Sequence, residues 1–250
     1  MQDLSETVIL TPTYNERDNI RHLVQRVFSL HPDVHVLVID DNSPDGTADA
    51  VRELTRSYPH LLLLSRQCKS GLGEAYKAGI AQVLRNKNVV SIITMDADGS
   101  HDPGDLAALR EQGRIHDVVV GSRYTSGGRI EKWERWRHML SRSGNTYARA
   151  ITGLPFSDVT AGFIHLRASK LRELDLSTLH SSGYAFLIEL KWALVKRLCA
   201  SATEVPITFK SRREGESKIS NHVIMEGIVT PWRVRYGASS GSRSPARGGS

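Results

Sequence analysis

Short apolar segments that alternate with segments of helical periodicity constrain the fold of this chain more than any other feature. Apolar runs of strand length occupy residues 8–10, 34–39, 61–64, 89–95 and 118–120. Helical spacing of apolar side chains covers residues 19–30, 47–56, 72–84 and a segment that begins at Pro103. Repeated strand–helix units fold into a mostly parallel sheet with helices on both faces. The sequence therefore predicts an α/β fold.

The pattern changes after Gly121. Apolar spacing predicts helices over residues 130–151 and 184–198 and a strand over residues 203–209. The last residues, 238–250, are rich in Gly, Ser and Arg, a composition typical of a disordered tail. We therefore expect one domain over residues 1–237 with this tail behind it.

The charge balance indicates an anionic partner. Lysines and arginines number 33 against 27 acidic residues, a net charge of +6. This surplus suits a nucleotide, a nucleic acid or an acidic membrane surface. The two cysteines, Cys68 and Cys199, argue against a disulfide framework and for a reducing compartment. No apolar stretch reaches the roughly 18 residues of a membrane span, so we expect a soluble, cytoplasmic chain with at most a peripheral membrane contact.

Two of the predicted strands end in acidic residues. The run 89–95 is followed by Asp96, Ala97 and Asp98, and the run 34–39 by Asp40 and Asp41. The carboxyl ends of parallel strands share the edge of the sheet at which α/β proteins bind ligands. Mg²⁺ sites commonly use one or two carboxylates plus phosphate oxygens. We therefore expect a divalent cation on a substrate diphosphate at Asp96 and Asp98.

Several sequence blocks occur in the order of a known family. Blocks at residues 11–16, 40–47, 71–73 and 95–98 resemble the inverting family 2 glycosyltransferases of the GT-A fold, which bind a nucleotide-diphospho-sugar. Blocks at residues 121–124, 158–163, 183–186 and 215–218 are similar to those of the dolichol-phosphate (polyprenol-phosphate) mannose synthases. The resemblance implies a nucleotide-sugar half over about residues 7–122 and an acceptor half over about residues 123–237.

On the donor side, the resemblance assigns roles to the acidic edge. Asp96 and Asp98 would hold Mg²⁺ or Mn²⁺ on the diphosphate, and Ser100 stands where some members add a metal ligand. Gly99 departs from the usual larger apolar residue, which we expect to loosen this loop. Asp45 is equally well explained as a turn residue or the cap of the following helix. The residues expected to contact the nucleotide-sugar are Pro12, Tyr14, Glu16, Asp40, Asp45, Asp96, Ala97, Asp98, Arg212 and Lys218.

On the acceptor side, the implied substrate is a lipid monophosphate. Arg123 and Arg137 are expected to bind its phosphate, because the planar guanidinium suits phosphate oxygens. Arg212 and Lys218 are expected to stabilise the departing diphosphate. A phosphate monoester is already largely ionised near neutral pH, so the nucleophile needs no strong general base. The expected catalytic residues are Asp98, Arg123, Arg212 and Lys218.

The implied reaction is transfer of mannose from GDP-mannose to a polyprenyl (dolichyl) monophosphate with inversion. The same chemistry with UDP-glucose is the alternative donor reaction. Trp133 and Trp136 among basic residues are typical of an interfacial helix, and a helix that packs them into the core fits equally well. Residues 228–236 are a weaker candidate for a second membrane contact. We expect peripheral association with the cytoplasmic face of a membrane, with a membrane-anchoring subunit left open.

Other functional classes fit parts of the sequence. Residues 92–100 resemble the first motif of haloacid-dehalogenase-type phosphatases, in which Asp96 would be a covalent nucleophile. That motif normally opens its domain, whereas about four strand–helix segments precede it here. A basic binding protein or an inactive transferase homologue with an altered loop at Gly99 is the non-enzymatic alternative. No motif with interleaved aromatic residues appears, so we expect no nucleic-acid partner.

Overall fold

The computed structural model describes residues 4, 6–181, 183–210 and 221–237. The predicted tail at 238–250 and two predicted site residues, Arg212 and Lys218, lie outside this part of the chain. The elements in chain order are β1 (Thr7–Thr13), α1 (Arg17–Leu30), β2 (His35–Asp40), α2 (Thr47–Leu54), β3 (Leu61–Ser65), α3 (Leu72–Val83), β4 (Ser91–Thr94), η1 (Pro103–Asp105), α4 (Leu106–Gly113), β5 (Val118–Ser122), β6 (Arg129–Ile130), α5 (Arg135–Thr152), β7 (Ile164–Arg167), α6 (Ala168–Glu173), η2 (Leu176–Thr178), α7 (Ala185–Trp192), η3 (Ala193–Arg197), β8 (Ala202–Pro206), β9 (Thr208–Phe209) and α8 (Asn221–Tyr236).

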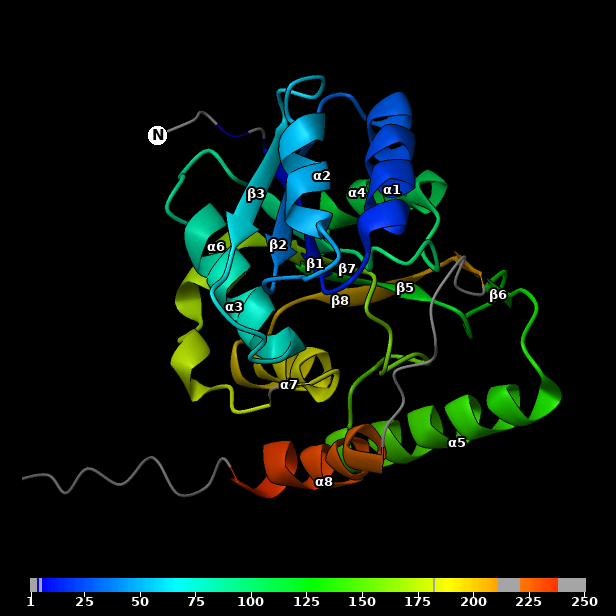
Figure 1. Cartoon of the computed structure of the whole chain (residues 1–250). Coiled ribbons are helices and arrows are strands. Elements are labelled where there is room, and N and C mark those ends of the chain that lie inside the picture. The colour runs from blue at the N-terminus through cyan, green and yellow to red at the C-terminus, as the bar shows by residue number, and fades with distance from the viewer. Residues whose placement is uncertain (1–3, 5, 182, 211–220, 238–250) are drawn as a thin grey trace, which may run out of the picture.

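The main sheet is mostly parallel, as the strand–helix pattern predicts. In the described part of the chain its strand order is β3-β2-β1-β4-β7-β5-β8. β7 runs antiparallel to both of its neighbours, β4 and β5, and all other pairs are parallel. Strands from both halves of the chain therefore share one sheet (Figure 1).

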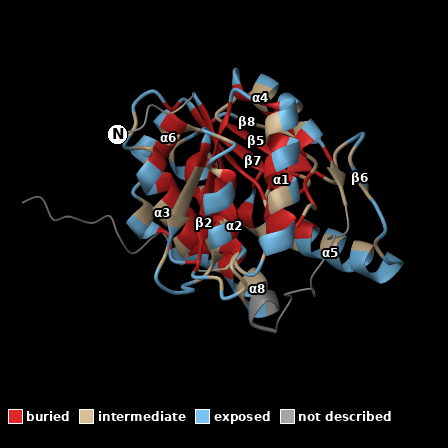
Figure 2. Cartoon of the chain, turned by 45° about the horizontal axis from the view of Figure 1, so that its top comes forward, coloured by how far each residue is buried: buried red, intermediate tan, exposed pale blue. Residues whose placement is uncertain are grey.

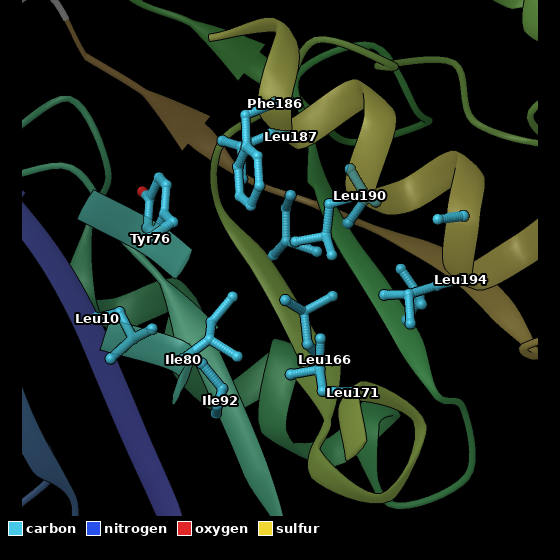
Figure 3. Close-up of a cluster of buried hydrophobic side chains, with 14 of the residues drawn as sticks. Leu10, Tyr76, Ile80, Ile92, Leu166, Leu171, Phe186, Leu187, Leu190 and Leu194 are labelled. Carbon is cyan, nitrogen blue, oxygen red and sulfur yellow. The ribbon is translucent and has the colours of Figure 1, made fainter. Parts of the chain in front are cut away.

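Helices cover both faces of the sheet, and each face has its own core. On β1, Leu10 packs into one core and Ile9 into the other, as alternating side chains of a strand must. The first core includes Tyr76 and Ile80 of α3 and Phe186 of α7 (Figure 3). The second is filled by apolar residues of α1, α2 and α4. The central strands β1, β2, β4 and β5 are accordingly almost completely buried (Figure 2).

Two predicted elements of the second half have different boundaries in the structure. The helix predicted over residues 130–151 begins only at Arg135, because Lys132 has a φ of 59°, a left-handed conformation that a helix does not contain. The strand predicted over 203–209 divides after Pro206, and β9 pairs with β6 outside the main sheet. The predicted helix over 184–198 is α7, which continues into a π-helical turn at Ala193–Arg197.

Several elements of the second half have no counterpart in the predictions, β7 and α8 among them. β7 has only four residues and includes His165 and Arg167, too short and polar for a clear period. α8 packs against α5 and α7, and Figure 1 shows α5 and α8 side by side at one end of the molecule. Within the described residues, no helix is both long and apolar enough to span a membrane.

Candidate functional site

Most of the predicted site residues that the structure describes gather at one edge of the sheet. The parallel strands β1, β2, β4 and β5 all end there, with Thr13 of β1 opposite Asp40 of β2. Because β7 is antiparallel, it begins at this edge, and Ile164 lies opposite Val120 of β5. The loops after the parallel strands and the loop that enters β7 therefore meet at one place.

Asp45 ties the first two loops of this edge together. One carboxylate oxygen accepts hydrogen bonds from the N–H and the hydroxyl of Thr47, at 3.0 and 2.6 Å. The other accepts from the N–H of Arg17 at 3.1 Å, and the Thr47 hydroxyl accepts from the N–H of Glu16 at 3.0 Å. Burial alone would raise the pKa of Asp45, but these hydrogen bonds hold it below its usual value. This geometry matches the interpretation of Asp45 as a turn and helix-start residue, and its nucleotide contact stays a prediction.

Asp40 and Asp41 are both buried, with different partners. The Asp40 carboxylate accepts from the hydroxyl of Thr13 at 3.0 Å and from the hydroxyl and N–H of Ser43 at 2.6 and 3.0 Å. Asp41 pairs with Arg66 at 2.6 Å, yet burial raises the pKa of its carboxyl group. Asp40 thus shapes the loop, and its contact with a base or ribose stays a prediction.

Pro12, Tyr14 and Glu16 form a partly exposed wall beside these carboxylates. The ammonium of Lys69 lies 3.8 Å from the centre of the Tyr14 ring, a cation–π contact. Glu16 accepts a hydrogen bond from the Asn19 amide at 2.8 Å. The loop after β3 therefore reaches over the loop after β1, as a nucleotide site built from several strand ends requires.

The loop predicted to bind the metal, residues 95–101, follows β4 and is called the metal loop below. Asp96 is half-buried, whereas Ala97, Asp98 and Ser100 are buried. The N–H of Ser100 donates to Asp98 Oδ1 at 3.0 Å. Gly99 has a φ of 77°, a conformation that glycine adopts without strain, so its presence suits this turn.

The donor chemistry of the metal loop fits Mg²⁺ or Mn²⁺. Carboxylates are hard oxygen ligands, and two of them suffice when phosphate oxygens and water complete the shell. Over the described residues, no group of three or more His, Cys, Asp and Glu side chains forms a closed metal site. The assignments of Asp96, Asp98 and Ser100 as metal ligands stay predictions.

Arg123, the first residue after β5, is held by a buried ion pair. Its guanidinium donates to both carboxylate oxygens of Asp158 at 2.7 Å and to the Thr160 hydroxyl at 2.9 Å. Burial alone would lower the pKa of Arg123, but Asp158 raises it, and Arg123 in turn lowers the pKa of Asp158 against the effect of burial. Arg123 is therefore already bound within the protein, and its predicted contact with the acceptor phosphate is untested.

Two further charged groups belong to this buried cluster. Lys191 of α7 is fully buried and donates to the carbonyl of Ala161 at 2.7 Å. Glu204 of β8 accepts from the N–H groups of Ser157 and Asp158, each at 2.9 Å. Burial lowers the pKa of Lys191 to about 7. Together these contacts fix the loop that enters β7.

This loop touches the metal loop. A Cβ added to Gly162 would lie 3.8 Å from Asp96 Oδ2, and the Thr94 hydroxyl donates to the Gly162 carbonyl at 2.6 Å. Arg137 lies apart from this contact, exposed at the start of α5, with Glu134 3.6 Å away. The structure thus brings Arg123 and the donor-side residues that it describes to one edge, with Arg137 on an outer helix.

The structural roles of Asp158, Lys191 and Glu204 were missed in the sequence. Asp158 lies within the block at residues 158–163, and Lys191, like Glu189, is a charged residue in a mainly apolar helix that starts at Ala185. The sequence therefore shows that Asp158 and Lys191 are unusual positions. It does not show what they contact, because the residues that they contact lie far away in the sequence and no local pattern could pair them.

Comparisons of the sequence with known proteins found similar chains. Residues 8–175 match the model of Glycosyl transferase family 2. The chain is 42% identical over 233 residues to the polyprenol monophosphomannose synthase of Mycolicibacterium smegmatis, covering 92% of this chain and 87% of that protein. It is 40% identical over 224 residues to the undecaprenyl-phosphate mannosyltransferase of Micrococcus luteus, covering 90% of this chain and 91% of that protein.

A solved structure shares the fold. Glucosyl-3-phosphoglycerate synthase from Mycobacterium tuberculosis, crystallised with Mn²⁺, UDP and glucosyl-3-phosphoglycerate, superposes with a TM-score of 0.68. The match covers 93% of this chain and 80% of that chain, at 16% sequence identity. At this identity the likeness concerns the fold, and it confirms the predicted GT-A architecture.

Proposed function

Because the chain belongs to glycosyl transferase family 2 and is a glycosyltransferase, we propose that it transfers mannose from GDP-mannose to a polyprenyl monophosphate. The observation that carries the proposal is the 42% identity, over 92% of the chain, to a polyprenol monophosphomannose synthase. Membership in this family also replaces the phosphatase alternative, since Asp96 lies behind the fourth strand and does not open the domain.

The donor binds across the carboxyl ends of β1, β2 and β4 in this proposal. Pro12, Tyr14 and Glu16 contact the nucleotide from one side, and the loop that Asp40 and Asp45 organise contacts it from the other. Asp96 and Asp98 hold Mg²⁺ or Mn²⁺, which when bound stabilises the negative charge of the departing diphosphate. The structural neighbour crystallised with Mn²⁺ and UDP supports the use of a divalent cation by this fold.

In this proposal the acceptor lipid approaches the metal loop from the side of α5. Arg137 is exposed, so its guanidinium is accessible to a lipid phosphate. The guanidinium of Arg123 already donates to Asp158 and Thr160 and would have to bind the phosphate as well. We therefore propose that Arg123 mainly shapes this side of the acceptor site. Arg212 and Lys218 remain the proposed cations for the leaving diphosphate.

The chemistry requires alignment more than proton transfer. The ionised acceptor phosphate provides an oxygen nucleophile without a general base. This oxygen forms a bond to the anomeric carbon while the bond from that carbon to the diphosphate breaks, and GDP leaves. In-line displacement inverts the anomeric carbon and gives a β-linked mannosyl phosphate.

The lipid acceptor lies in a membrane, and α5 and α8 carry exposed apolar side chains that can contact it. Trp136, Met139 and Leu140 are 57%, 72% and 57% exposed and follow the i, i+3, i+4 spacing of one helix face. On α8, Ile228, Val229 and Trp232 are similarly exposed. An apolar face among arginines is typical of an interfacial helix at the cytoplasmic leaflet. The exposure of Trp136 contradicts the alternative that α5 packs this tryptophan into the core.

Parallel donor assays test the proposal. Membranes that contain polyprenyl phosphate are incubated with the chain, Mn²⁺ or Mg²⁺, and either radiolabelled GDP-mannose or UDP-glucose. We expect label from GDP-mannose alone to enter the organic phase. Label from UDP-glucose alone would support the alternative donor, and label from neither donor would contradict the proposed function.

A further inference from the structure

We propose that His101 is a positioning residue of the metal loop, because its imidazole fixes the main chain at Asp96. This inference rests on the proposed function, since it assumes that Asp96 and Asp98 hold a divalent cation. His101 is not expected to touch the cation or the substrates.

The hydrogen bond at Asp96 defines the state of the imidazole. The N–H of Asp96 donates to His101 Nδ1 at 3.1 Å. A nitrogen that accepts carries no proton, so this geometry assigns the neutral ring with its proton on Nε2. The bond joins the two ends of the turn. Inside the turn, the N–H of Ser100 donates to Asp98 Oδ1. The main chain at Asp96 and the carboxylate of Asp98 are thus each held by a separate hydrogen bond.

Packing holds the His101 ring in place. The side chain is only 3% exposed. Its ring stacks on Phe163 with centroids 4.9 Å apart and planes at 19°, and it meets the edge of Phe209 at 5.6 Å. The N–H of Lys210 donates to the carbonyl of Ser100 at 3.0 Å. The orientation of the metal loop therefore depends on residues from the second half of the chain.

The hydrogen bond between Asp96 and His101 matters because the loop contains Gly99. Glycine leaves the main chain of a turn with more accessible conformations than other residues do. An open site with two carboxylates binds its cation well only if both are held in place beforehand. Outer groups that orient ligands typically change metal affinity by about 10–100-fold when they are removed.

Three substitutions separate hydrogen bonding from packing. His101→Phe keeps a ring for stacking and removes the acceptor. His101→Asn removes the ring and keeps an acceptor, Oδ1, at the position of Nδ1. His101→Gln moves the acceptor to the position of Nε2. The affinity for Mn²⁺ is measured from the electron paramagnetic resonance signal of free Mn²⁺ with saturating GDP, and in a parallel series with UDP. Thermal unfolding without metal reports the effect on the fold.

We expect His101→Phe and His101→Gln to weaken Mn²⁺ binding by about tenfold or more. His101→Asn should bind Mn²⁺ nearly as well as the unchanged chain, even if its unfolding temperature falls more than that of His101→Phe. Equal Mn²⁺ affinity of His101→Phe and the unchanged chain would overturn the inference. If His101→Phe does not fold, equal affinity losses in His101→Asn and His101→Gln would overturn it. If the unchanged chain binds no Mn²⁺ with either nucleotide, the metal site and this inference both fail.

Discussion

At the scale of single residues, the proposed metal site depends most on the carboxylate of Asp98. Asp98→Asn keeps an oxygen that can accept from the N–H of Ser100 and removes the negative charge. We expect sugar transfer to fall by about 100-fold or more, with the unfolding temperature nearly unchanged. Initial rates at several Mn²⁺ concentrations measure this effect. The control is Asp49→Asn on the exposed face of α2, and a rate for Asp98→Asn equal to that of this control would contradict the metal site.

The second prediction at this scale concerns Lys191 and the pH dependence of stability. Burial lowers its pKa from 10.5 to about 7, so between these values the unfolded chain binds more protons than the folded chain. The contribution of Lys191 to stability is therefore complete above pH 10.5 and is lost as the pH falls towards 7. In this window the free energy of unfolding should rise with pH by up to about 1.4 kcal/mol per unit from this group.

Lys191→Met should remove that contribution and flatten the rise. Denaturant unfolding at several pH values between 7 and 10.5 measures the free energy of unfolding of both chains. The exposed neighbour Lys196 supplies the control, because Lys196→Met should keep the slope of the unchanged chain. A slope for Lys191→Met equal to that of the control would show that Lys191 stays charged when buried.

At the scale of elements, the contacts around Gly73 explain why the block at residues 71–73 has a glycine at this position. A Cβ on Gly73 of α3 would lie 2.4 Å from the carbonyl oxygen of Ser181 and 3.0 Å from Phe186 Cβ. Gly73→Ala should therefore destabilise the protein by about 1–3 kcal/mol. Gly144 of α5 has nothing within 4 Å of its added Cβ, so Gly144→Ala should stabilise by about 0.5–1 kcal/mol. Urea unfolding of both variants checks this, and equal effects would contradict the packing of α3 against α7.

The exposed face of α5 supports a second prediction at this scale. The triple variant Trp136→Ser, Met139→Ser and Leu140→Ser should lower binding to vesicles with anionic lipids by at least about tenfold. The measurement is co-sedimentation with the vesicles. A matched control changes three exposed apolar residues near the amino ends of strands, Leu30, Val90 and Ile115, to serine. Equal losses in the two triple variants would rule out α5 as the membrane contact.

Elements differed in how well the sequence predicted them, for physical reasons. The strands of the first half are continuous apolar runs, so β1 to β5 lie where the pattern placed them. The predicted start of α5 was wrong because Ile130 and Trp133 continue the helical spacing of apolar residues through Lys132. Lys132 has a positive φ, which the spacing of apolar residues does not reveal. β6 and β9 have two residues each, too few for any period.

At the scale of the whole molecule, the site forms where distant segments meet. The sequence predicted the acidic edge, because each carboxylate directly follows its own strand. It could not predict that Arg123 pairs with Asp158, since this contact depends on the antiparallel insertion of β7. The link from Asp96 through His101 to Phe163 depends on the same insertion. Among the described strands of the main sheet, the reversed strand β7 thus joins the second half of the chain to the loop at residues 95–101.

The central claim is the identity of the transferred sugar and of its acceptor. The most direct test incubates the purified chain with polyprenyl monophosphate, Mn²⁺ and equal concentrations of GDP-mannose and UDP-glucose. The lipid product is isolated, its anomeric configuration is determined by nuclear magnetic resonance, and the sugar released by mild acid is identified by chromatography. We expect a polyprenyl β-mannosyl phosphate formed together with GDP. A glucosyl lipid, an α-linked product or free mannose without a lipid product would contradict it.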